Sequence, residues 1–268
     1  MDGFYGRILE IDLSSRQARV KPLAAEVLRS CLGGKGLATW LLSHFNPPGV
    51  DPLSPENHLI FATGPLTGSR IWGSSRYGVF SKSPQTGIYS ESYSGGRVPE
   101  AIDACGFDAL VISGRSSSPL VLYIHPDGAE FHPAGELWGQ DTYASEELLR
   151  RRFRRLEGSG VKRGCVVIGP AGENLVRFAV IENDFWRSAG RTGLGAVMGS
   201  KKLKGISFEG DRSRPLAAPE AVADLARELS RSARDNPGVQ AYKQMGTPMM
   251  VKIMNGAGAF PTRYWSRG

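Results

Sequence analysis

Hydrophobic and polar residues alternate along the first segment of the chain. In "GRILEIDLSSRQARVKPL", Leu9, Ile11 and Leu13 alternate with polar neighbours, and the alternation resumes after a break at Ser14 and Ser15. A period of two residues puts alternate side chains on one face of a strand, and a polar break between two such runs is typical of a hairpin. The pattern therefore predicts two strands joined by a turn.

The pattern next changes to helical spacing and then returns to strands. The segment "AAEVLRSCLGGKGLATWLLSHF" predicts a helix, a glycine-rich break and a second helix, which Pro47 and Pro48 end. From Leu59 onward, short apolar runs separated by glycine turns predict strands. These runs are "LIFATGPLTG", "RYGVFSKSPQTG", "DALVISGR", "PLVLYIHPDGAEFHPAG" and "CVVIGPAGENLVRFAVIEND".

Two short helices are predicted between the strands, at residues 98–105 and 194–202. Each follows glycines and an arginine and precedes a short apolar run. The segments "FATGPLTG" and "VVIGPAGE", at residues 61–68 and 166–173, also resemble each other. These similarities indicate an internal duplication. Each half would contain a strand ending in Gly-Pro, further strands, a loop with glycine and arginine, a short helix and a last strand.

The last part of the sequence has a different pattern. "AVADLARELSRSARDN" predicts an amphipathic helix, so we expect a first domain over residues 1–210 and the helical start of a second over residues 211–268. Hydrophobic surface should be exposed there, and the chain should be more mobile beyond Leu216, unless a second polypeptide covers it. The residues expected at this surface are Leu225, Leu229, Met249 and Met250.

The composition is that of an ordinary globular protein. Of the 268 residues, 41% are hydrophobic and 22% are charged, which is typical of a folded domain. No window approaches the roughly 18 uncharged apolar residues of a membrane span, and residues 1–30 carry acidic side chains, unlike a signal peptide. We therefore expect a cytoplasmic protein that does not bind membranes.

Cysteine and histidine are sparse and scattered. Cys31, Cys105 and Cys165 form no C-x-x-C pair, so they provide neither a disulfide framework nor the ligands of a zinc or iron–sulfur site. The four histidines show no metal-binding spacing either. We predict that the cysteines are buried small apolar residues and that no such cluster binds a metal directly.

The net charge of +7 and the pI near 9.4 favour an anionic partner. The densest basic run is "RRRFRR" at residues 150–155, which follows Glu146 and Glu147 and precedes Gly158. Acidic residues at the start and arginines at the end are typical of a solvent-exposed helix that complements its own dipole. We favour this interpretation over nucleic-acid binding, because no recognisable nucleic-acid motif accompanies the run.

One stretch combines glycines with arginines and lysines: "RSAGRTGLGAVMGSKKLKG", from Arg187 to Gly205. Glycine lets a ligand approach the main chain, a helix N-terminus offers unpaired N–H groups, and Arg187 and Arg191 can bind a phosphate. No clear strand directly precedes Gly193 and the Walker spacing is absent, which disfavours a dinucleotide-binding or P-loop domain. The alternative is that these glycines only pack a tight helix against a sheet.

These segments together resemble the amino-terminal part of the aldehyde ferredoxin oxidoreductases, tungsten enzymes that carry two pterin cofactors on one metal. The matching motifs follow the expected order across nearly the whole chain. They are "YGRILEIDLSS", "GGKGLA", "DPLSPENHLIFATGPLTG", "SRYGVFSKSPQTG", "GFDALVISGR", "LWGQDTY", "IGPAGENLVRFAVI" and "SAGRTGLGAVMGSKKLKG". The resemblance implies an α+β fold in which two mostly antiparallel β-sheets form a base, or saddle, with a few short helices.

The resemblance also implies which residues hold the cofactor. They are Arg76, Tyr93, Gly95, Arg187, Ser188, Gly190 and Arg191. These segments would hold the phosphate ends of a bis-molybdopterin, with Mg²⁺ bound by the backbone carbonyls of Tyr93 and Ser188. Asparagine and alanine are common in the family at these two positions, and contacts made by the backbone would tolerate both differences.

The implied function is that of the N-terminal part of a tungsten (or molybdenum) oxidoreductase that oxidises aldehydes to carboxylic acids and passes electrons to ferredoxin. Family members continue beyond this chain, and that part brings the C-x-x-C-x-x-x-C ligands of a [4Fe–4S] cluster and the catalytic groups. We therefore expect the isolated chain to be inactive and identify no catalytic residue in it.

The expected partners are ferredoxin, a small aldehyde and the C-terminal portion of the enzyme or a second subunit. Nucleic acid is not expected, and homo-oligomerisation is left open. The alternative function is a non-catalytic module that binds a pterin or another anion, or a remnant without redox activity of its own.

Overall fold

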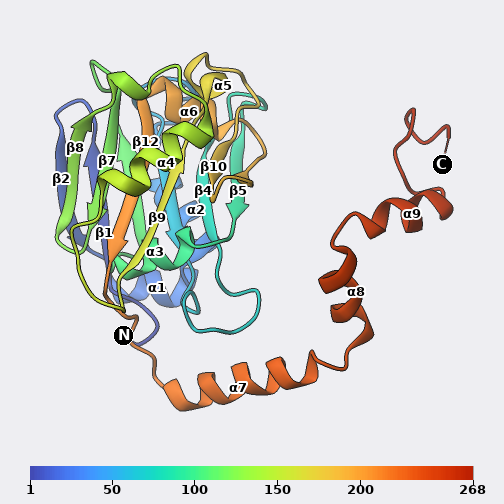
Figure 1. The fold of residues 1–268 in the computed structure, drawn as a ribbon. Coiled ribbons are helices and arrows are strands. Elements are labelled where there is room, and N and C mark those ends of the chain that lie inside the picture. Colours follow the sequence, from blue (N-terminus) through green and yellow to red (C-terminus); the bar gives the residue numbers. More distant parts are fainter. Residues whose placement is uncertain (268) are drawn as a thin grey trace. The chain divides into compact units, whose positions relative to one another are not determined.

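The computed structural model describes residues 1–267 and divides the chain into two units (Figure 1). The first unit is Met1–Ala218 and contains both β-sheets and the short helices between their strands. The second begins at Pro219 and is helical. The predicted α+β class is confirmed, and so is the helical character of the last part of the chain.

The first sheet contains the six strands of the N-terminal half. They are β1 (Arg7–Asp12), β2 (Gln17–Pro22), β3 (Leu59–Thr63), β4 (Tyr77–Lys82), β5 (Tyr89–Ser94) and β6 (Ala109–Ser113). Their order in the sheet is β2-β1-β6-β3-β4-β5. Only the β1–β6 pair is parallel, and the other neighbours run antiparallel.

The second sheet repeats this topology with the next six strands. They are β7 (Leu120–His125), β8 (Gly128–Pro133), β9 (Lys162–Val167), β10 (Ile181–Asn183), β11 (Arg187–Ala189) and β12 (Leu203–Gly210). Their order is β8-β7-β12-β9-β10-β11, and only β7–β12 is parallel. In each half a hairpin comes first, and the last strand returns beside it. The structure therefore confirms the predicted internal duplication.

Short helices connect these strands and cover the sheets. They are α1 (Ala25–Cys31), α2 (Gly34–Phe45), α3 (Val98–Ala104), the 3-10 turn η1 (Gly135–Leu137), α4 (Thr142–Arg152), α5 (Pro170–Glu173) and α6 (Leu194–Ser200). The helices predicted at residues 98–105 and 194–202 correspond to α3 and α6. Helices α1 and α2 cover the outer face of the first sheet, and α4 covers that of the second (Figure 1).

The main hydrophobic core lies between the two sheets. It contains inward-facing residues of both, such as Phe61 and Ile206, together with residues of α3 and α6. Glycines allow α3 to pack directly on the second sheet: a methyl group at Gly164 would lie 2.9 Å from Cα of Val98. Burial of this apolar surface is the main stabilising contribution to the fold.

Two edge strands meet at one side of this core. Strand β5 ends the first sheet and β11 ends the second, and the two lie side by side. Hydrogen bonds at and beside the strands join them. The Ser83 hydroxyl, before β5, donates to the Thr192 carbonyl, after β11, at 2.7 Å, and the N–H of Arg191, after β11, donates to the Ser92 hydroxyl of β5 at 3.2 Å. The duplication therefore brings corresponding strands of the two halves together.

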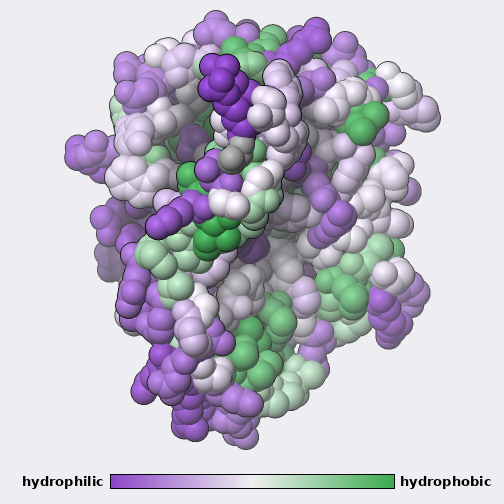
Figure 2. All heavy atoms as spheres, turned by 90° about the vertical axis from the view of Figure 1, so that its right-hand side faces the viewer, coloured by the Kyte–Doolittle hydropathy of each residue, from purple (hydrophilic) through white to green (hydrophobic). Residues whose placement is uncertain are grey.

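The second unit consists of three helices, α7 (Pro219–Ser232), α8 (Pro237–Met245) and α9 (Met249–Gly256). None of the three contains a fully buried residue. Leu225 and Leu229 are exposed as predicted, whereas Met249 and Met250 are partly buried. On the molecular face shown in Figure 2, exposed hydrophobic residues form patches among hydrophilic ones.

Within residues 1–267, no helix is long and apolar enough to cross a membrane. The same residues contain no cluster of three or more His, Cys, Asp or Glu side chains that could hold a metal ion. Cys105 and Cys165 are buried, as predicted, and burial raises the pKa of both thiols. Cys31 is only partly buried.

Candidate functional site

Two glycines follow strand β5 and lie between two arginines. A methyl group at Gly95 would be 3.6 Å from Nη1 of Arg187 and 3.6 Å from Cδ of Arg76. Arg76 directly precedes β4 of the first sheet, and Arg187 begins β11 of the second. The structure therefore brings together three of the residues predicted for the site, although they are far apart in the sequence.

Gly96 requires its glycine for two reasons. Its φ of +87° is a conformation that other residues rarely adopt, and a methyl group there would overlap the Asp184 carboxylate and lie 2.8 Å from Cδ of Arg187. The turn therefore packs closely against Asp184 and Arg187, with Gly95 buried and Gly96 partly buried. We call Arg76, Gly95, Gly96 and Arg187 the arginine cradle.

Three further predicted residues lie on β11 or directly after it. Ser188 and Gly190 are exposed, and so is Arg191. The Ser188 hydroxyl donates to Oε1 of Glu182 at 2.8 Å, so its side chain is already engaged. The hydroxyl hydrogen is therefore directed at Glu182.

The cradle has the charge and hydrogen-bonding capacity that a phosphate needs. Arg76, Arg187 and Arg191 are exposed, and no carboxylate of residues 1–267 forms an ion pair with any of them. The Ser75 hydroxyl beside them is buried and has no hydrogen-bond partner among these residues. Free guanidinium groups and an unsatisfied hydroxyl can bind an anion that accepts several hydrogen bonds.

Tyr93 places its side chain away from the arginines. The phenol donates to Oε2 of Glu91 at 3.1 Å, and its ring contacts Phe80 edge-on at 5.8 Å between centroids. Phe80 belongs to the core that α1 and α2 form with the first sheet. Partial burial and the neighbouring Glu91 carboxylate raise the pKa of Tyr93. The Tyr93 side chain is therefore accommodated on the outer face of β5.

A hollow of about 410 Å³ adjoins the cradle. Its lining residues are Gly96, Arg97, Arg150, Asp184, Phe185, Trp186 and Arg187. Trp186 is 77% exposed, and its ring lies beside those of Phe185 and Tyr143. The cradle thus borders a partly aromatic, largely basic surface.

The second half of the Arg187–Gly205 stretch has a structural role. Methyl groups at Gly193, Gly195 and Gly199 would overlap the carbonyls of Arg177, Val180 and Gly172. The N–H of Gly195, near the start of α6, already donates to the Ala179 carbonyl at 3.0 Å. These glycines pack α6 tightly, so the packing interpretation is correct for this half and the exposed arginines belong to the other.

The lysines that follow α6 are also internal. Lys201 is fully buried and donates to the carbonyls of Pro55 and Gly114 at 3.1 and 3.2 Å. Lys204 is fully buried and forms an ion pair with Glu173. The sequence analysis included both lysines in the basic stretch expected to bind an anion. In the structure, Lys201 and Lys204 instead hold loops and helices together inside the protein.

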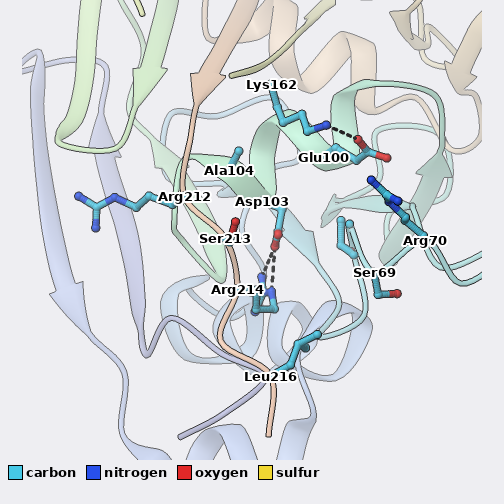
Figure 3. A pocket seen from close by; sticks show the side chains of 12 residues that line it. Ser69, Arg70, Glu100, Asp103, Ala104, Lys162, Arg212, Ser213, Arg214 and Leu216 are labelled. Carbon is cyan, nitrogen blue, oxygen red and sulfur yellow. Dashed lines mark hydrogen bonds and ion pairs between the residues drawn. The ribbon is translucent and has the colours of Figure 1, made fainter. Parts of the chain in front are cut away.

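A second hollow, of about 280 Å³, contains a buried ion cluster (Figure 3). Arg214 bonds the carboxylates of Asp103 and Asp108 at 2.6 and 2.7 Å and the Gly3 carbonyl at 3.0 Å. It also stacks on Tyr5, 4.6 Å from the ring centroid. Because these charges satisfy one another, the cluster anchors the segment after β12 to the N-terminus and the first sheet.

Comparison with known proteins identifies the family. The family model "Aldehyde ferredoxin oxidoreductase, N-terminal domain" matches residues 8–210, which include both sheets and the cradle. The chain belongs to the aldehyde ferredoxin oxidoreductase family. The resemblance inferred from the sequence motifs is therefore confirmed.

Two of the relatives described here are tungsten-containing enzymes. The chain is 41% identical, over its whole length, to the tungsten-containing aldehyde ferredoxin oxidoreductase of Thermococcus kodakarensis and 39% identical to that of Pyrococcus furiosus. It covers 44% of each, so it spans less than half the length of these relatives. It is 34% identical, over 85% of its length, to the WOR-like subunit of an aliphatic sulfonate oxidoreductase of P. furiosus, of which it covers 38%.

A solved structure has the same fold. It is the active-site complex BamBC of benzoyl coenzyme A reductase in complex with 1,5-dienoyl-CoA. The match has a TM-score of 0.81 and 33% sequence identity, and it covers 87% of this chain and 35% of the other. The family fold therefore occurs in oxidoreductases with different substrates, so the fold alone does not identify the substrate.

Proposed function

We propose that the first unit of this family member holds the phosphate end of a tungsten (or molybdenum) bis-pterin cofactor. The single observation that carries the proposal is the arginine cradle: Gly95 lies between Arg76 and Arg187, and no carboxylate among residues 1–267 forms an ion pair with either guanidinium group. A phosphate dianion requires several donors and positive charge, and glycine lets it approach the main chain.

The residues of the cradle and its neighbours would bind different parts of the cofactor's phosphate end. Arg76 and Arg187 donate bidentate hydrogen bonds to phosphate oxygens, and the Ser75 hydroxyl supplies a further donor. The backbone carbonyls of Tyr93 and Ser188 would provide hard oxygen ligands, the type that Mg²⁺ prefers. These two residues lie on β5 and β11, the adjacent edge strands, so each half of the duplicated fold contributes one.

The activity of the whole enzyme would be the oxidation of an aldehyde to a carboxylic acid with ferredoxin as electron acceptor. When bound, the cofactor supplies the redox chemistry. This chain contributes binding, orientation and charge neutralisation. A [4Fe–4S] cluster and the catalytic groups would come from the rest of the longer protein, as would the pocket that selects the aldehyde.

The experiment that tests this function uses the chain together with its natural continuation. Pterin, phosphate and metal are measured per protein in the wild type and in an Arg76→Ala, Arg187→Ala double variant. A matched control replaces Arg154 and Arg231, which are exposed and lie outside the cradle. We expect the cradle variant to lose most of its pterin and the control to retain it. Unchanged pterin in the cradle variant would refute the assignment.

A further inference from the structure

Asn183 lies completely buried at the meeting point of the two sheets. It ends β10, and its Oδ1 accepts hydrogen bonds from the Tyr77 phenol at 2.9 Å and the Ser94 hydroxyl at 2.8 Å. Its Nδ2 donates to the Gly95 carbonyl at 3.0 Å and to Oδ2 of Asp184 at 3.0 Å. One carboxamide therefore uses its full hydrogen-bonding capacity and bonds residues of both halves.

Asp184 continues this connection toward Arg187. Its Oδ2 also accepts from the Arg97 N–H at 2.8 Å, and its Oδ1 accepts from the Arg150 guanidinium at 2.6 Å. Gly96 packs directly against the same carboxylate and against Arg187. The carboxylate is thus held by three separate segments and forms one wall of the cradle.

We propose that Asn183 and Asp184 are positioning residues that fix the two halves of the arginine cradle at the spacing required by a dianion. This proposal rests on the proposed function. Strands β5 and β11 belong to separate sheets, so no backbone ladder sets the distance between Gly95 and Arg187. The Nδ2 bond from Asn183 to the Gly95 carbonyl constrains this distance directly, because Asn183 also pairs with Arg187 in the β10–β11 ladder. A displacement of about 1 Å is sufficient to weaken a preorganised site severely.

The test measures binding of inorganic sulfate by calorimetry. Sulfate stays dianionic across the pH range used, whereas phosphate groups titrate near pH 6. Asn183→Leu removes all four hydrogen bonds without adding a charge. Asn183→Asp keeps the shape but loses the donor to Gly95 whenever the new carboxyl is ionised. We expect both variants to bind sulfate at least about tenfold more weakly than the wild type at pH 8.

The pH profile separates positioning from general structural damage. The new carboxyl of Asn183→Asp would contact Tyr77 on β4, Ser94 on β5 and the adjacent Asp184. The charged groups next to these are Arg150 and Glu146 on α4, through Asp184, and Glu182 and Arg187 in the β10–β11 ladder. Burial and the adjacent Asp184 carboxylate should raise its pKa. We expect Asn183→Asp to regain near-wild-type affinity at acid pH, where the protonated carboxyl again donates, and Asn183→Leu to remain weak throughout.

Matched controls use the other side of the same carboxamide. Tyr77→Phe and Ser94→Ala each remove one bond to Oδ1 and leave both Nδ2 bonds intact. Their affinity should change less than about threefold, even where their thermal stability falls as far as that of the Asp variant.

Two results would overturn the positioning role. One is that folded Asn183→Asp binds sulfate like the wild type at pH 8, and the other is that its affinity stays low at acid pH. If Asn183→Leu does not fold, the pH profile of the Asp variant still decides between these outcomes. Absence of sulfate binding by the wild type would refute the cradle itself, and with it this inference.

Discussion

At the scale of single residues, glycine has two different functions in this protein. Gly193, Gly195 and Gly199 let α6 pack tightly against neighbouring carbonyls. Gly95 and Gly96 instead let a turn pass closely between charged side chains, Gly95 beside Arg76 and Arg187 and Gly96 against Asp184. The distinction depends on the surroundings of each glycine, because the residue itself is the same in both cases.

Gly96→Ala should therefore disrupt the cradle. The methyl group would overlap the Asp184 carboxylate in addition to straining a backbone with φ of +87°. Gly87→Ala is the matched control, because Gly87 has φ of +75° and nothing within 4 Å of the added methyl group. We expect urea unfolding to show a loss of about 1–2 kcal/mol for Gly87→Ala and about 2 kcal/mol more for Gly96→Ala. Equal losses would mean that Asp184 and Arg187 move aside freely.

Lys201 should make the free energy of unfolding depend on pH between about 7 and 10.5. Burial and the nearby Arg115 charge lower its pKa from 10.5 to about 7 in the folded protein. Between these values the unfolded chain binds one more proton, so this group makes stability rise with pH, by about 1.4 kcal/mol per unit. Lys201→Met should remove that component. Urea unfolding at pH 7 and pH 9 measures it, and identical slopes for the variant and the wild type would contradict a neutral buried amine.

At the scale of elements, α4 shows how the basic run is neutralised. Arg150 pairs with Glu146 and Asp184, and Arg151 pairs with Glu147. Arg152 and Arg155 pair with Glu136 and Glu130 respectively. The interpretation of this segment as a helix that complements its own charges is therefore supported, although α4 ends at Arg152 and the last arginines follow it.

Arg150→Ala should cost much more stability than Arg154→Ala. Glu146 is completely buried and would lose its cationic partner, whereas Arg154 is exposed. We expect a loss of about 2–3 kcal/mol for Arg150, less than for a wholly buried pair because this arginine is 30% exposed, and less than about 0.5 kcal/mol for Arg154. Chemical denaturation of both variants provides the comparison. Similar losses would show that Glu146 does not depend on Arg150.

The elements of the fold could largely be predicted from the sequence, because each has a local signal. Alternation predicted the first hairpin, and glycine punctuation predicted the other strands and both short helices. The site could be predicted only in part. Arg187 and Lys201 look alike in a basic stretch, yet only the three-dimensional packing decides that one is exposed and the other buried. Asn183 gave no signal, because its role depends on partners from distant strands.

At the scale of the whole molecule, the fold is a duplicated pair of sheets followed by a separate helical unit. The first unit continues past β12 to Ala218, because Arg214 is buried with Asp103 and Asp108. In this unit the two edge strands that carry the cradle come from equivalent places in the two halves. The duplication thus places two similar segments beside each other around one site.

Two shortened chains would test where the first unit ends. A chain ending at Ala218 keeps the Arg214 cluster, and one ending at Gly210 leaves Asp103 and Asp108 buried without their partner. We expect the first to unfold at the same temperature as the full chain and the second to be less stable by about 3–5 kcal/mol. Calorimetry measures both, and equal stability of the two would show that the segment after β12 is not needed.

The most direct test of the central claim is to locate a dianion in crystals of the chain. Selenate, a heavy analogue of sulfate, gives an anomalous signal that marks its position without reference to the protein model. The account predicts a peak beside Gly95, between the guanidinium groups of Arg76 and Arg187, that is much weaker in Asn183→Leu crystals soaked at the same selenate concentration. Peaks only elsewhere, for example beside Arg154 and Arg163, would contradict it.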